Sequence, residues 1–128
     1  MTNERSASIT IAGQDYELLL TTRATKEIAK RYGGLANLGE QLMKTENFET
    51  ALDEVVWLIT LLANQSLLIH NLRNPSQPKE LLTPEEAELF TTPLDLSAYK
   101  EAILLAMVRG TKREVLSEET SSKNESVE

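Results

Sequence analysis

The apolar segment at residues 49–74 constrains this 128-residue chain more than any other feature of its sequence. Its apolar side chains recur at helical spacing and leave only narrow polar lines along the helix that this period predicts. Such a helix needs neighbours on nearly every side, so it forms either the centre of a small domain or a surface for another protein's helices. A chain of this length suits one domain with a substantial core.

Two polar lines divide the predicted helix when its residues are placed at intervals of about 100°. The first line consists of Asp53, Thr60, Asn64 and Asn71, and the second of Glu54 and Gln65. Between the lines lies a narrow apolar strip, which we call the Trp57 ridge: Trp57, Leu61, Leu68 and Leu72. The opposite side of the helix is a broad apolar face made of Leu52, Val55, Leu58, Ile59, Leu62 and Ile69.

The broad face suits the core of the domain, whereas the Trp57 ridge has two interpretations. It can dock a helix of a partner protein, which makes its four residues the candidate partner-binding site. It can also pack against the last helix of the same chain. A domain of this size needs most of its apolar residues inside, and this need favours the second interpretation.

The residues before the central helix predict a hairpin followed by two shorter helices. Apolar and polar residues alternate over residues 8–20 and are interrupted at Gly13, which is typical of two strands joined by a turn. From Thr22 the apolar residues follow a helical period that stops at the pair Gly33 and Gly34. A shorter apolar period predicts a second helix over residues 35–43.

The residues after the central helix predict two more helices. Thr83, Pro84 and Glu86 form a strong start signal, with a cap, a proline in the first turn and a capping box. A last helix is predicted over residues 96–109. Gly110 is expected to end or bend it, with residues 111–116 as a short extension in the second case.

These elements predict a mainly α fold, with four to five helices packed as one compact domain and an N-terminal β-hairpin as its minor α+β component. We expect residues 1–7 to be disordered and residues 8–116 to form the single helical domain. Residues 117–128 are rich in serine and glutamate and nearly devoid of apolar residues, which predicts a flexible acidic tail or linker.

Composition and charge restrict the classes of partner. A formal net charge of −7 argues against nucleic acid and anionic membranes, both of which favour a basic surface. The sequence has no cysteine, which excludes disulfides and cysteine-ligated metals and fits a reducing compartment. The first eight residues lack the apolar core of a signal peptide.

The acids Asp53 and Glu54 argue against a membrane span at residues 49–74. We therefore expect a cytoplasmic protein.

The sequence offers no reaction centre. His70 has no metal-binding neighbour at helical spacing, and Asp53 and Glu54 point about 100° apart, so they do not form a facing acid pair. Gly33 and Gly34 follow a helix and lack the lysine of a phosphate loop. The basic face of the first predicted helix is interpreted as a solvated surface: Arg23, Lys26, Lys30 and Arg31. We expect no enzyme activity, no catalytic residue, no cofactor and no metal.

The order of these elements resembles the small tail assembly chaperones of long-tailed bacteriophages and prophages, in their shorter, non-frameshifted form. The resemblance lies in the hairpin, helix and glycine pair of SITIAGQDYELLLTTRATKEIAKRYGGL, in the apolar segment LDEVVWLITLLANQSLL, and in the acidic tail. Another helical adaptor or regulator that acts through protein–protein contacts is the alternative class.

The resemblance implies a protein of the bacterial host cytoplasm that is not part of the mature virion. It implies that the chain binds and solubilises the tape measure protein and helps to recruit tail tube subunits, and it leaves self-association open. Many such chaperones also have a longer, frameshifted form. Ser122, Lys123 and Asn124 can be encoded by codons that contain the slippery heptamer A AAA AAC, so we hypothesise that residues 117–128 form that junction.

Overall fold

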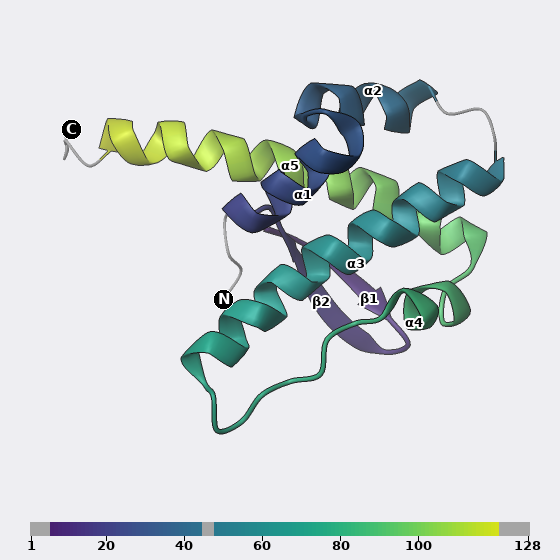
Figure 1. The fold of residues 1–128 in the computed structure, drawn as a ribbon, viewed down its shortest axis with the longest axis horizontal. Helices are drawn as coiled ribbons and strands as arrows, with labels where there is room; N and C mark the ends of the chain where they lie inside the picture. Colours follow the sequence, from purple (N-terminus) through teal and green to yellow (C-terminus); the bar gives the residue numbers. More distant parts are fainter. Residues whose placement is uncertain (1–5, 45–47, 121–128) are drawn as a thin grey trace.

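The computed structural model describes residues 6–44 and 48–120. Two strands are followed by five helices, which confirms the predicted mainly helical fold with its N-terminal hairpin (Figure 1). The elements are β1 (Ser6–Ile11), β2 (Gln14–Leu19), α1 (Thr22–Tyr32), α2 (Leu35–Lys44), α3 (Phe48–Arg73), α4 (Pro84–Leu89) and α5 (Pro93–Thr120).

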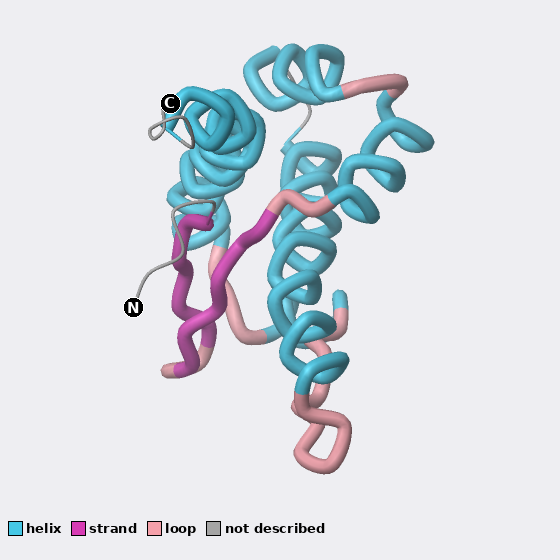
Figure 2. Tube along the Cα trace, turned by 90° about the vertical axis from the view of Figure 1, so that its left-hand side faces the viewer, coloured by secondary structure: helices cyan, strands magenta, loops and turns pink. Residues whose placement is uncertain are grey.

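The hairpin has a tight two-residue turn and is held by helices at both of its edges. Ala12 and Gly13 adopt positive φ angles of 52° and 80°, as the twist of a short hairpin requires. The hydroxyl of Tyr99 in α5 donates to the carbonyl of Thr10 at 2.6 Å, and the hydroxyl of Ser66 in α3 donates to the carbonyl of Glu17 at 3.1 Å. A hairpin alone is only marginally stable, so these helices supply the packing that it needs (Figure 2).

The broad face of α3 forms the centre of the core, as predicted. Leu58, Ile59 and Leu62 are fully buried and belong to one apolar cluster with residues of the hairpin, α1 and α5. Within α3, the stretch Glu49–Arg73 is long and apolar enough to cross a bilayer by length and composition. In this fold the apolar length of α3 is used to hold the other elements together.

Both ends of α1 and the start of α4 lie where the sequence predicts them. Thr21 caps α1, and Gly33 ends it with a φ of 91° and a bond from its N–H to the carbonyl of Ala29. Thr83 and Glu86 form the predicted capping box of α4. Asparagine is a common N-cap, so the sequence also predicts Asn47 as a cap for α3; this residue lies outside the described part of the chain.

The last helix is longer than the predicted range 96–109 at both ends. The helix begins at Pro93, because Thr92 and Asp95 exchange backbone and side-chain hydrogen bonds of 3.0 and 3.3 Å in a second capping arrangement. It also continues through Gly110. A Cβ atom at Gly110 would lie 2.9 Å from the Cβ of Leu20, so this glycine permits a close approach between elements and does not end the helix.

The predicted limits of the domain, residues 8–116, and of the tail, residues 117–128, stay predictions. β1 begins at Ser6, and the side chain of Ala7 is buried. α5 includes residues 117–120 of the predicted tail. Residues 121–128 lie outside the described part of the chain.

Candidate functional site: a groove along helix α3

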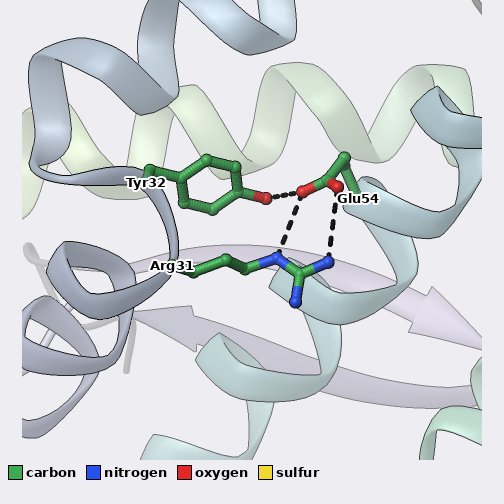
Figure 3. Close-up of polar contacts among 3 residues, drawn as sticks. All are labelled: Arg31, Tyr32 and Glu54. Atoms are coloured by element: carbon green, nitrogen blue, oxygen red, sulfur yellow. Dashed lines mark hydrogen bonds and ion pairs between the residues drawn. The ribbon is translucent and has the colours of Figure 1, made fainter.

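The second polar line of α3, Glu54 and Gln65, binds the two ends of α1. The side chain of Gln65 accepts a hydrogen bond of 2.5 Å from the hydroxyl of Thr21, at the start of α1. At the other end of α1, the carboxylate of Glu54 accepts two bonds of 3.3 Å from Arg31 and a further bond from the hydroxyl of Tyr32 (Figure 3). Side chains therefore connect the two antiparallel helices at both ends.

The first polar line of α3 holds the segment that leads into α4. Asn64 donates to the carbonyl of Leu82 at 2.8 Å and accepts from its N–H at 2.7 Å. Asn71 repeats this two-point contact with Lys79, at 3.0 and 2.7 Å. Seven helical residues advance about 10.5 Å, and three extended residues about 10 Å, so the two asparagines fit the spacing of their partners.

The two walls leave an open groove along α3, with Trp57, Leu61 and Leu68 at its floor. The groove has a volume of about 560 Å3. It is lined by Arg23, Glu27 and Arg31 from α1, by Asp53, Val56, Trp57, Thr60, Leu61, Asn64, Gln65 and Leu68 from α3, and by Leu81, Pro84 and Glu88. In Figure 1, α1 and the segment before α4 lie on either side of α3.

Leu72 lies in a continuation of this groove. A second cavity of about 450 Å3 has Arg23, Gln65 and Leu68 in common with the first, and Leu72 lines it with its side chain 83% exposed. The four residues of the Trp57 ridge thus line two adjoining cavities, which share Arg23, Gln65 and Leu68. Among the described residues, no residue of α5 lines these cavities. Trp57 and Leu61 are nevertheless half-buried and also pack against the core cluster, to which α5 contributes.

Trp57 is fixed in place by its neighbours on α1. The guanidinium of Arg31 lies 4.5 Å from the centre of the Trp57 ring, and the ring of Tyr32 meets it edge-on at 6.0 Å. Stacking on Arg31 contributes about 0.5–1 kcal/mol at an exposed site. Because Glu54 holds Arg31 at the same time, the half-buried indole is kept in one position at the groove floor.

Two of the three residues considered for chemistry, His70 and Glu54, make hydrogen bonds within the protein. His70 closes the turn after α3: its Nε2 lies 3.1 Å from the carbonyl of Gln77, so this nitrogen carries the hydrogen. Glu54 faces α1, whereas Asp53 faces the groove, as expected for adjacent helical residues that point about 100° apart. Within the described residues there is no cluster of three or more histidine, aspartate or glutamate side chains suited to a metal ion.

The helical wheel alone does not predict which segments form the walls of the groove. The sequence feature that indicates one wall is the pair Asn64 and Asn71, seven residues apart on one polar line, because such amides can bind an extended backbone segment. Of the predicted basic face, Arg23 and Arg31 line the groove, while Lys26 and Lys30 do not. The site is therefore an apolar channel with hydrogen-bonded walls and a few charged groups at its rim, an arrangement that suits binding of an apolar helix face.

Comparison with protein-family models finds no match to this chain, and searches of curated proteins and of solved structures find no similar protein.

Proposed function

We propose that this protein is a tail assembly chaperone that covers apolar helical segments of a tape measure protein in the groove along α3. The observation that carries the proposal is the groove itself, because it leaves a tryptophan and three leucines accessible between two braced walls. The proposal also rests on the resemblance of the sequence to phage tail assembly chaperones. In this role the chain acts in the host cytoplasm, helps to recruit tail tube subunits and is absent from the virion.

The dimensions of the groove suit a helical guest. Trp57 and Leu72 are fifteen residues apart, which corresponds to about 22 Å of helix and therefore to a guest of about four turns. Isolated amphipathic helices of a long protein expose apolar stripes that promote aggregation, and covering such a stripe removes it from water. Aromatic and leucine side chains at the centre of the contact are expected to supply most of the affinity. The net charge of −7 keeps the resulting complex soluble.

Coexpression with the tape measure protein of the same phage or prophage tests the proposal. We expect the soluble fraction of the tape measure protein to rise when the chain is present, and to fall again with Leu68→Asp. Leu68 lies at the groove floor and is half-buried, so the substitution places a charge where the guest binds. The matched control is Leu94→Asp, since Leu94 is 80% exposed and lies outside the groove.

The results separate the chaperone from another kind of adaptor. Circular dichroism and thermal unfolding must show that both variants fold. If the tape measure protein is equally soluble with and without the chain, the chaperone proposal is wrong. The gene order provides an independent check: a chaperone predicts a tail tube gene upstream and a very long tape measure gene downstream.

A further inference from the structure

The charged residues that line the groove differ in whether they are already paired. Arg31 is bound by Glu54, and Glu27 lies 3.5 Å from Lys30. The remaining three are Arg23, Asp53 and Glu88. All three are exposed, and no ion pair joins any of them to another side chain in the described part of the molecule.

These three charges are separated along the groove. Asp53 and Glu88 lie together, since both line the groove and also a smaller adjoining cavity beside Pro93 and Leu96. Arg23 lies at the other end, where it lines both the main groove and the cavity that contains Leu72. The distance from Asp53 to Leu68 along α3 is fifteen residues, or about 22 Å.

We infer that the groove binds a guest helix in one orientation, with a basic end beside Asp53 and Glu88 and an acidic end beside Arg23. This inference rests on the proposed function, because it assumes that the groove holds a helix. An apolar stripe of leucines looks similar in both directions, so apolar contacts alone select the direction weakly. Charges at a rim select among alternative arrangements, because the reversed guest places like charges against each other at both ends.

The size of this preference follows from the exposure of the charges. Exposed pairs are partly screened by water and salt, so each contact changes the equilibrium about two- to fivefold. Three contacts acting together then favour one orientation by about tenfold or more at low salt. The preference should shrink at high ionic strength, while apolar binding remains.

Trp57 provides a built-in probe of orientation. It is the single tryptophan of the sequence, and it lies one helical turn from Asp53 but eleven residues from Leu68, which is about 16 Å along α3. Two synthetic 18-residue helices with the same leucine stripe serve as guests. One has lysines in its first turn and glutamates in its last turn, and the other has the reverse. Each is prepared with a nitroxide label, a short-range quencher of tryptophan fluorescence, at either its basic or its acidic end.

For both peptides, we expect the label to quench Trp57 strongly when it is at the basic end and weakly when it is at the acidic end. The triple variant Arg23→Glu, Asp53→Lys, Glu88→Lys should reverse this pattern, and all three positions are exposed, so the fold should tolerate it. The control is Lys26→Glu with Glu85→Lys, which changes exposed charges outside the groove on α1 and α4, two of the three helices altered in the triple variant.

The possible failures are distinguishable. Equal quenching from both ends overturns the orientation while the groove remains a helix-binding site. Quenching that follows the amino-terminal end of the peptide, whatever its charge, also overturns it. If neither unlabelled peptide changes the fluorescence of Trp57 or competes with the other, the groove does not bind helices, and the proposed function fails with the orientation.

Discussion

Replacing Asn64 by alanine removes the contact that fixes the far wall of the groove. Its side chain makes two hydrogen bonds with the backbone of Leu82, at 2.8 and 2.7 Å, and the side chain of Leu82 is only 4% exposed. Each bond contributes about 1 kcal/mol net, and backbone groups left unpaired beside a buried side chain add to the loss. We therefore expect the variant to lose about 2–3 kcal/mol of unfolding free energy.

Asn71→Ala is the matched control, because Asn71 makes the same two-point contact with Lys79 at an exposed position. Water can replace both bonds there, so the expected loss is only about 0.5–1 kcal/mol. Urea unfolding followed by circular dichroism measures both values. Amide hydrogen exchange provides a local readout, since the N–H of Leu82 should lose its protection in the Asn64 variant.

Asn64→Asp tests the same reasoning from a second direction. The carboxylate can still accept from the N–H of Leu82, but it cannot donate to the carbonyl that lies 2.8 Å away. It should therefore remain clearly less stable than the parent chain at neutral pH and recover part of the loss when the carboxylate is protonated. Equal losses for Asn64→Ala and Asn71→Ala, within about 0.5 kcal/mol, would refute the argument that burial determines the strength of these contacts.

Two further predictions concern the packing of α5. Gly110→Ala should lower the free energy of unfolding by about 1 kcal/mol, because the clash of the new methyl group with Leu20 outweighs the gain in helix propensity. Gly39 in α2 has open space around it, so Gly39→Ala should instead raise the free energy of unfolding by up to about 1 kcal/mol. Thermal unfolding measures both changes. The pKa of Tyr99 is raised, first by burial and second by the charge of Asp95. The folded state thus favours the neutral phenol, so this contribution to stability is complete below pH 10 and is lost as the pH rises through the raised pKa. Urea unfolding between pH 9 and 11 should therefore show a smaller fall in the free energy of unfolding for Tyr99→Phe than for the parent chain.

Local signals predicted most of the elements, because their causes lie within a few residues. The hairpin turn, the glycine end of α1 and the Thr83 cap each depend on neighbours in the sequence. The start of α5 was equally local: Thr92, Pro93 and Asp95 repeat the pattern of Thr83, Pro84 and Glu86 with an aspartate in place of the glutamate, and the prediction missed it.

Features that depend on distant residues were harder to predict. Gly110 looks like a helix end, but its role is set by Leu20, ninety residues earlier in the chain. The helical wheel separated the Trp57 ridge from the core face, because both lie on one rigid element. It could not identify what lies on either side of the ridge, since the partners of Asn64 and Gln65 belong to segments whose position is determined by the whole fold.

The separation of α3 into two faces has a consequence for how such a protein can change over generations. The broad face of α3 packs in the core together with buried residues of α1 and α4, and side chains such as Gln65 and Asn64 add single contacts that position the groove walls. If the groove binds helices as we propose, substitutions along it should alter which helix is accepted, while the opposite face of α3 keeps its packing in the core. Leu68 and Leu72 are the two ridge residues outside the core cluster and its packed neighbours, so a library that varies these two positions should change the bound helix with the least effect on folding.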